Sequence, residues 1–250
     1  MSASGRALIL CTSPRSGSTM LCRLLQATGV AGAPESWFHR PDAFDWLRGL
    51  GLTAPDGATE REAAALAFEG ARAAGTRGGV FGLRLQRHSF AYFRARLAEV
   101  HPRPAGDAAR MRSAFGPALF VHLSREDAAA QAVSYEIARQ SGLWHRHADG
   151  AELERLAPPA EPEFDLEALR ARREELSAWD ADWRAWFAAE GVSPVRARYE
   201  DLAADPAGVL RGILAALGAD PAAADGVAPA TARLADARSR DWADRLRCSG

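Results

Sequence analysis

The segment that decides the fold is Ala7-Leu-Ile-Leu-Cys11, followed at once by Thr12-Ser-Pro-Arg-Ser-Gly-Ser-Thr19. Its first five residues are a short apolar run between polar residues, which predicts a buried strand of a parallel sheet. The run from Met20 to Ala27 is amphipathic and is followed by Gly29, which is typical of a helix with a glycine near its C-cap. The chain therefore opens with a strand, a loop rich in serine, threonine and glycine, and a helix.

The same alternation continues along the chain. Further buried strands and helices are expected in turn, the strands at 80–85, 118–123 and 195–199, the helices at about 126–140, 164–190 and from Asp205-Pro206 onward. Strands that alternate with helices form a parallel sheet with helices on both of its faces. We therefore predict an α/β fold with a P-loop-like parallel sheet, covered by helices on both faces, in a single domain over residues 1–250.

Composition limits the classes of function. The chain has 250 residues, a formal net charge of −1 and 48% hydrophobic residues, which is typical of a globular protein and does not indicate a nucleic-acid partner. No apolar run is long enough for a secretion signal or a membrane span, so we expect a cytoplasmic protein without stable membrane insertion. The three cysteines have no metal-ligand spacing, and no metal is expected.

The loop after the first strand has the composition of an anion site. A loop of this kind directs backbone N–H groups and the positive end of the helix at a negative ligand. The glycine allows close approach, the arginine adds a fixed charge and the hydroxyl groups add donors, so the candidate ligands are Ser13, Arg15, Ser16, Gly17, Ser18 and Thr19. The Walker pattern of nucleotide P-loops is incomplete here, because its first glycine and its lysine are missing. A polar turn that only caps a helix is the ordinary alternative.

Two segments resemble known sulfotransferases. Ser13-Pro-Arg-Ser-Gly-Ser-Thr19 resembles the 5′-phosphosulfate loop of enzymes that use 3′-phosphoadenosine-5′-phosphosulfate (PAPS), and Ala27-Thr-Gly-Val-Ala-Gly-Ala-Pro34 resembles the bacterial trehalose 2-sulfotransferase family. The resemblance implies a sulfotransferase fold, PAPS as the sulfuryl donor, and in-line, metal-independent transfer to a hydroxyl of a small carbohydrate or glycolipid. It also implies that Arg15 contacts the transferring group and that the protein is a homodimer, with apolar surface offered by the Trp-bearing helix at 164–190.

The resemblance extends to a second place, at the end of the strand at 118–123. Arg125 follows this strand, and open α/β sheets bind ligands at the carboxyl ends of their strands. Ser134 lies about two helical turns further on, at a distance that can return to the same pocket. The resemblance implies that Arg125 and Ser134 bind the 3′-phosphate of PAPS.

Two later segments complete the resemblance. The tail from Arg233 to Trp242 is rich in arginine and poor in apolar residues, which favours a loop that closes over an anion. It resembles the family's C-terminal segment, which contributes to cofactor binding, and Arg238 and Ser239 are the candidates within it. Arg198-Tyr-Glu-Asp-Leu202 resembles a motif frequent in sulfotransferases, and we interpret it as scaffold whose carboxylates cap the next helix.

The general base is the point at which the sequence departs from its relatives. In Gly32-Ala-Pro-Glu-Ser-Trp-Phe38, Glu35 is present, but Ser36 stands where the trehalose enzymes have their catalytic acid. Glu35 is our first choice, and His88 is the alternative, because cytosolic sulfotransferases use a histidine after a comparable strand. Ala33 replaces another acid of the trehalose enzymes, which weakens trehalose as the acceptor. The candidates for acceptor contact are Glu35, Ser36, Trp37 and Arg84, the last standing where the family has a lysine.

Two other classes of function remain open at this point. A P-loop kinase or NTPase needs the Walker lysine and a strand-terminal aspartate for magnesium, and neither is visible. A non-catalytic module that binds adenosine bisphosphate would keep the loop at 13–19 but has no need of the acidic segment beside it.

Overall fold

The computed structural model describes residues 6–146, 150–229 and 236–249. Its main sheet has the strand order β2-β3-β1-β4-β7. The bounds of these strands are β1 (Arg6–Thr12), β2 (Thr76–Arg77), β3 (Val80–Gln86), β4 (Ala118–Ser124) and β7 (Val195–Arg198). All are parallel except the two-residue β2, which runs antiparallel to β3. The carboxyl ends of four strands therefore meet at one edge of the sheet.

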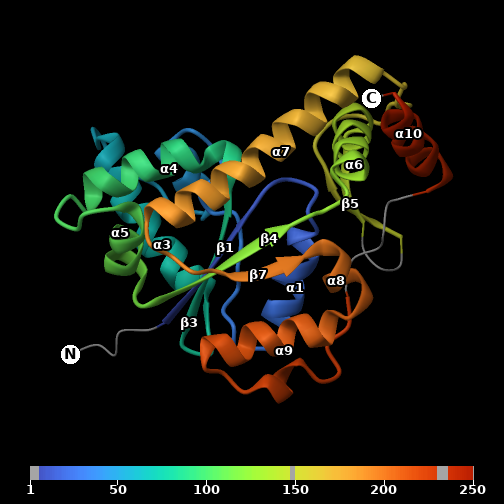
Figure 1. Ribbon diagram of the computed structural model, residues 1–250. Coiled ribbons are helices and arrows are strands. Elements are labelled where there is room, and N and C mark those ends of the chain that lie inside the picture. Colours follow the sequence, from blue (N-terminus) through green and yellow to red (C-terminus); the bar gives the residue numbers. More distant parts are fainter. Residues whose placement is uncertain (1–5, 147–149, 230–235, 250) are drawn as a thin grey trace.

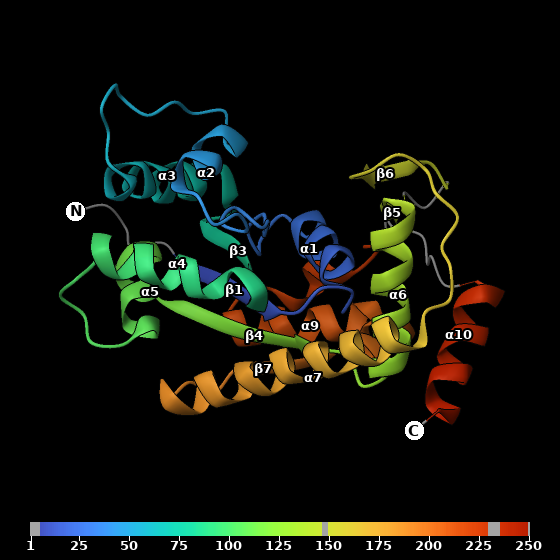
Figure 2. The same cartoon turned by 90° about the horizontal axis from the view of Figure 1, so that it is seen from above.

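The central strand β1 divides the interior into two cores. Ala7, Ile9 and Cys11 face one core, while Leu8 and Leu10 face the other, as the alternation of side chains along a strand requires. The first core is covered by α2 (Ala43–Gly49), α3 (Glu60–Gly75), α4 (Arg87–Val100), α5 (Asp107–Phe115) and the second half of α7 (Leu166–Ala189). The opposite core is covered by α1 (Ser18–Ala27), α8 (Tyr199–Ala204) and α9 (Pro206–Leu217), followed by a short 3-10 helix at Pro221–Ala224. Figures 1 and 2 show the helices on both faces, which confirms the predicted α/β class.

A third cluster lies beyond the carboxyl edge of the sheet. It joins α6 (Ala128–Ser141), the first half of α7 and α10 (Ala237–Cys248), and Figure 2 shows α10 beside α6. The expected loop at the tail is therefore wrong for the residues from Ala237 onward, which form a helix. Trp242, Ala243 and Leu246 are spaced to share one helix face and are buried, and the Asp236 carboxylate caps the helix by accepting the N–H of Ser239 at 2.9 Å. Residues 233–235 of the expected loop lie outside the described residues.

An antiparallel hairpin that the sequence did not predict follows α6. It consists of β5 (Leu143–Arg146) and β6 (Glu152–Arg155) and starts after Gly142, whose φ of 73° caps α6 in the left-handed region. A Cβ atom at Gly142 would lie 2.3 Å from the carbonyl oxygen of Ala157, so only glycine allows the hairpin to leave the helix in this way.

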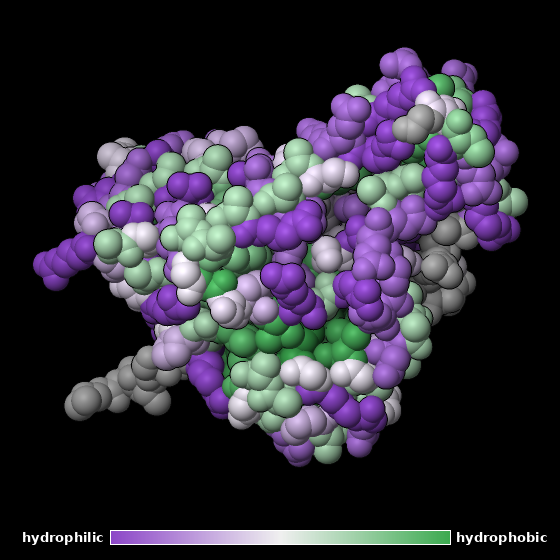
Figure 3. All heavy atoms as spheres, in the orientation of Figure 1, coloured by the Kyte–Doolittle hydropathy of each residue, from purple (hydrophilic) through white to green (hydrophobic). Residues whose placement is uncertain are grey.

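The surface of α7 differs from the sequence-based expectation. Trp183 and Trp186 are buried in the first core and Trp179 is half-buried against the third cluster, so the tryptophans of this helix do not form an apolar surface. Figure 3 shows a mostly hydrophilic face, with hydrophobic residues gathered between β7 and α9. In the part of the chain that the structure describes, no helix combines the length and hydropathy needed to cross a membrane.

Candidate active site

The loop between β1 and α1 has a backbone that leaves donors for an anion. Arg15 has φ 62°, the one positive φ of a non-glycine residue within 6–146, 150–229 and 236–249, and Gly17 at the N-cap of α1 has φ 83°. Left-handed backbone at a non-glycine residue is unfavourable and is concentrated at functional sites. The first N–H groups of α1, beginning with Ser18, lack intrahelical acceptors and lie at the positive end of the helix.

Buried hydroxyl groups hold this loop together from inside. Ser16 is fully buried, and its hydroxyl donates to the Ser13 carbonyl at 2.8 Å and lies 2.5 Å from the Thr12 hydroxyl. The Thr12 hydroxyl donates in turn to the carbonyl of Leu123 on β4 at 2.8 Å. The hydroxyl protons of Thr12 and Ser16 are thus both donated to carbonyl groups within the fold. The Ser16 hydroxyl therefore supports the loop from inside. Ser13 and Ser18 are also buried.

The Arg15 side chain lies across the mouth of the loop. Its Nε donates to the Ser134 hydroxyl at 3.0 Å and its Nη1 to the Trp144 carbonyl at 2.5 Å. Removal of the guanidinium from water and repulsion by Arg125 lower the pKa of Arg15 to about 10. Two cations held close together, with desolvation opposing their charge, favour the binding of an anion between them.

Arg125 is positioned by the loop and by α8. Its Nη1 donates to the Arg15 carbonyl at 3.1 Å, and its guanidinium lies 4.4 Å from the centre of the Tyr199 ring. The structure therefore brings together three of the predicted cofactor ligands, Arg15, Arg125 and Ser134, which are far apart in sequence. Tyr199 was interpreted only as scaffold, and its ring also lies directly against Gly17.

The carboxylates after Tyr199 support the site from a different position than expected. Glu200 accepts the N–H groups of Glu126 at 3.2 Å and Asp127 at 3.4 Å, ahead of α6, and does not cap the next helix. Asp201 pairs with Arg198 at 2.7 Å. The cap of α9 comes from Asp205, whose carboxylate accepts the N–H of Gly208 at 2.8 Å.

Arg84 connects the loop with the acidic segment. It stands at the carboxyl end of β3, where its Nη1 donates to the Thr19 hydroxyl at 2.9 Å and its Nε to the Ser36 hydroxyl at 2.8 Å. Its Nη2 lies 3.9 Å from Oε2 of Glu35, and its side chain is 14% exposed against 42% for Glu35. A largely buried cation thus sits between the anion loop and a carboxylate that is open to solvent.

Glycines allow the acidic segment to lie against β3. Glu35 forms a parallel bridge with Leu83, with the Arg84 N–H donating to the Glu35 carbonyl at 3.0 Å. A Cβ atom on Gly82 would lie 2.4 Å from the nitrogen of Pro34, and one on Gly32 would lie 2.6 Å from the nitrogen of Gly82. Close backbone contact therefore fixes the position of Glu35 and Ser36 relative to the sheet.

His88 and Trp37 lie at the border of this region. His88 is exposed in the first turn of α4, with its ring centre 5.7 Å from that of Trp179 on α7. The Trp37 indole donates to the Gly82 carbonyl at 3.3 Å and is half-buried against the first core. The contacts that join Arg84, Thr19, Ser36 and Glu35 include neither of the two.

Arg238 and Ser239 lie at the start of α10. The Arg238 guanidinium pairs with Glu161 at 2.9 Å, and the Ser239 hydroxyl donates to Asp236 at 2.9 Å. These contacts do not join the two residues to the anion loop, so their part in cofactor binding stays a prediction.

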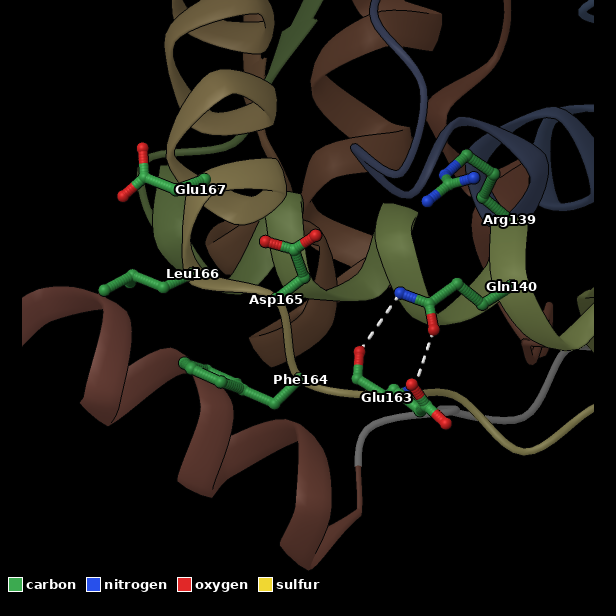
Figure 4. Close-up of a pocket in the computed structure, with 7 residues that line it drawn as sticks. All are labelled: Arg139, Gln140, Glu163, Phe164, Asp165, Leu166 and Glu167. Atoms are coloured by element: carbon green, nitrogen blue, oxygen red, sulfur yellow. Dashed lines mark hydrogen bonds between the residues drawn. The ribbon is translucent and has the colours of Figure 1, made fainter.

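A separate hollow of about 620 Å³ lies at the start of α7 and shares no residue with this site. Figure 4 shows the Gln140 side chain there, where it donates to the Glu163 carbonyl at 3.2 Å and accepts the Glu163 N–H at 2.7 Å. These two bonds tie the end of α6 to the segment that leads into α7. We interpret Gln140 as structural.

Several residues of the site escaped the sequence analysis. The Gln131 amide donates to the Pro14 carbonyl at 2.7 Å, the Trp183 indole donates to the Thr12 carbonyl at 2.8 Å, and His145 Nε2 lies 3.1 Å from the Thr19 hydroxyl. Neither their spacing nor a local motif distinguishes these residues from ordinary core or surface positions. Their roles depend on which elements pack together.

The chain is similar to known sulfotransferases over nearly its whole length. The family model described as Stf0 sulphotransferase matches residues 7–249. The trehalose 2-sulfotransferases of Mycobacterium tuberculosis (strain ATCC 35801 / TMC 107 / Erdman) and Mycolicibacterium smegmatis (strain ATCC 700084 / mc(2)155) are 33% and 30% identical to the chain, each over 99% of this chain and 96% of the relative. The solved sulfotransferase of Alicyclobacillus acidocaldarius aligns with a TM-score of 0.46 and 18% identity over 97% of this chain and 94% of that chain. The resemblance inferred from the sequence is confirmed by a family match over nearly the whole chain: this protein is an enzyme of the Stf0 sulphotransferase family.

Proposed function

We propose that this enzyme transfers the sulfuryl group of PAPS to a hydroxyl of a small carbohydrate, with a trehalose-type disaccharide as its acceptor. The observation that carries the proposal is the position of Arg84. This cation lies within hydrogen-bond distance of Thr19 in the anion loop and of Ser36 beside the candidate base Glu35. A donor anion and an acceptor hydroxyl would therefore meet at one guanidinium.

The residues present fit the donor. The loop at 13–19 offers the N–H groups at the start of α1 and the Arg15 charge to the 5′-phosphosulfate. Arg125 and Ser134 lie close enough to Arg15 to hold the 3′-phosphate of the same molecule. Arg238 and Ser239 would add contacts to the nucleotide from α10. When bound, PAPS supplies the sulfuryl group and an adenosine bisphosphate as leaving group.

The chain itself supplies charge stabilisation and a base. Arg15 and the first N–H groups of α1 stabilise the negative charge that develops on the departing oxygen, because they are held in place before the reaction. The half-buried carboxylate of Glu35 is open to an acceptor and would take the proton of its hydroxyl. Arg84 lies between the anion loop and Glu35 and holds the reacting groups in line.

The burial of Ala33 weakens one objection to trehalose as the acceptor. Ala33 is 4% exposed and its N–H donates to the Gly75 carbonyl at 2.8 Å, so this position faces the interior and does not line an acceptor surface. Ser36 remains a departure from the trehalose enzymes, with its hydroxyl bound to Arg84. The two relatives that are named for trehalose support a disaccharide as the acceptor.

Turnover of labelled PAPS with trehalose, other disaccharides, a glycolipid and a phenol tests the proposal. We expect the highest kcat/KM with trehalose or a related disaccharide. Calorimetric titration with adenosine 3′,5′-bisphosphate should show tight binding, and ATP with Mg²⁺ should bind more weakly. Turnover with the phenol alone would contradict the carbohydrate assignment, and a preference for ATP with Mg²⁺ would contradict the donor assignment.

A further inference from the structure

The hairpin β5–β6 is attached to the anion loop at two points. The Trp144 carbonyl accepts the Nη1 proton of Arg15 at 2.5 Å, and the Nε2 atom of His145 lies 3.1 Å from the hydroxyl oxygen of Thr19. Both partners in the loop belong to the predicted donor site. The hairpin therefore contributes a titratable side chain to the site, at a position with no role in the function described so far.

The direction of the hydrogen bond between Thr19 and His145 follows from Arg84. A guanidinium can only donate, so the Thr19 oxygen accepts from Arg84 Nη1 at 2.9 Å. The hydroxyl still has one proton to donate. A neutral imidazole with its proton on Nδ1 presents a lone pair at Nε2, which can accept that proton at the observed 3.1 Å.

The surroundings of the imidazole favour its neutral form. Burial lowers the pKa of His145 to about 3, together with three cations that face the ring: Arg15 from the loop, Arg84 from β3 and Arg23 from α1. The opposing group is Glu154 on β6, whose Oε2 lies 3.5 Å from Nε2. This distance is beyond an ordinary hydrogen bond, and the carboxylate is 46% exposed, so water screens its charge.

We propose, on the basis of the function above, that His145 is a positioning residue for sulfuryl transfer, which accepts the hydroxyl proton of Thr19 and thereby fixes Arg84 between the donor loop and Glu35. With its proton committed to His145, the Thr19 oxygen presents its lone pair to Arg84. Arg84 is then held at both ends, by Thr19 and by Ser36. His145 acts through these two bonds and does not touch the reacting atoms.

Two substitutions separate this role from packing. His145→Gln keeps an uncharged acceptor near the place of Nε2, and His145→Leu removes the acceptor while keeping apolar volume. We expect His145→Leu to lower kcat about 10–100-fold, because a small displacement of a positioning group has effects of that size, and to change the affinity for adenosine 3′,5′-bisphosphate by less than about twofold. His145→Gln should retain kcat to within about fivefold of the wild type.

Controls address the fold of the hairpin. Glu152→Gln weakens the Glu152–Arg155 pair on β6 without touching the loop and should leave kcat unchanged. Thermal unfolding of each variant shows whether the domain is intact. Equal loss of kcat in His145→Gln and His145→Leu, an unchanged kcat in His145→Leu, or a loss confined to the affinity for adenosine 3′,5′-bisphosphate would each overturn the proposal.

The tautomer of His145 can be measured without turnover, and therefore independently of the proposed sulfuryl transfer. In wild-type protein with ¹⁵N-labelled histidine, the His145 signals, assigned by their absence from His145→Gln, should show an unprotonated Nε2 and a protonated Nδ1 at neutral pH. A protonated Nε2 would overturn the proposal. If this tautomer is found but adenosine 3′,5′-bisphosphate does not bind, the proposed donor is wrong and the hydrogen bond of Thr19 stands.

Discussion

A Cβ atom added to Gly17 would lie 2.5 Å from Cδ2 of the Tyr199 ring. The ring therefore closes one side of the anion loop. The Arg125 guanidinium also packs on this ring, with its central carbon 4.4 Å from the ring centre. Through Tyr199, the position of the loop and the position of the candidate 3′-phosphate ligand depend on each other.

Gly17→Ala should disturb the loop in two ways. The left-handed φ of 83° costs an alanine about 1–2 kcal/mol, and the contact with Tyr199 adds about 1–3 kcal/mol of overpacking. Gly57→Ala is the matched control, since Gly57 also has a positive φ, 74°, but nothing within 4 Å of its added Cβ. Denaturant unfolding should show the larger loss for Gly17→Ala, with weaker binding of adenosine 3′,5′-bisphosphate. Equal losses in the two variants would show that the Tyr199 contact relaxes freely.

Arg125→Ala should affect ligands according to their 3′-phosphate. Loss of a charge-assisted contact costs about 1.5–3 kcal/mol, so the affinity for adenosine 3′,5′-bisphosphate should fall about 10–100-fold. Adenosine 5′-phosphate, which lacks the 3′-phosphate, should lose far less. Arg211→Ala, which removes an exposed partner of Asp225 on α9, serves as the control. Equal weakening of both nucleotides by Arg125→Ala would show that Arg125 does not recognise the 3′-phosphate.

Glu35→Gln should distinguish the two candidate bases. A positioned carboxylate contributes roughly 10²–10⁴-fold to such a step, so kcat should fall by that order while PAPS affinity stays nearly unchanged. His88→Asn should matter much less, because His88 is exposed beside Trp179 and takes no part in the contacts around Arg84. The measurement is steady-state turnover with saturating donor. The reverse pattern would assign the base to His88, and small effects from both would exclude the two together.

The homodimer stays a prediction of the family resemblance. The buried tryptophans of α7 leave that helix without the expected apolar surface, whereas β7 is the edge of the main sheet and hydrophobic residues reach the surface between it and α9 (Figure 3). Light scattering at tens of micromolar should give twice the 26.8 kDa mass of one chain. A mass of one chain at that concentration would end the prediction.

The sequence by itself determined the parallel sheet, the anion loop and the family. The largely apolar runs at 7–11, 80–85 and 118–123 predict strands because a strand covered on both faces of a parallel sheet is mostly apolar, and the structure confirms all three. The loop at 12–19 holds its arginine, glycine and hydroxyl residues next to one another in the chain, so its anion-binding chemistry can be recognised from local sequence. These features are encoded by residues that are neighbours in the chain. Of the three classes considered, namely sulfotransferase, P-loop kinase or NTPase, and non-catalytic nucleotide-binding module, the family match supports the sulfotransferase.

Local order was insufficient elsewhere. The helix α10 was mistaken for a loop because its apolar residues are few, and only packing against α6 shows that Trp242, Ala243 and Leu246 form one buried face. The helices α2 to α5 were not predicted either; the buried face of α3, for example, consists mainly of alanines, which do not distinguish a core face from a surface.

Tertiary structure alone decided how the site is joined. Thr19, Arg84 and His145 lie on α1, β3 and β5, and no spacing in the sequence relates them. They meet because parallel strands direct their carboxyl ends to one edge and because Gly142 turns the hairpin back over α1. A hydrogen bond depends on a donor–acceptor distance of about 3 Å, and such distances between remote segments are set by the packing of the whole fold.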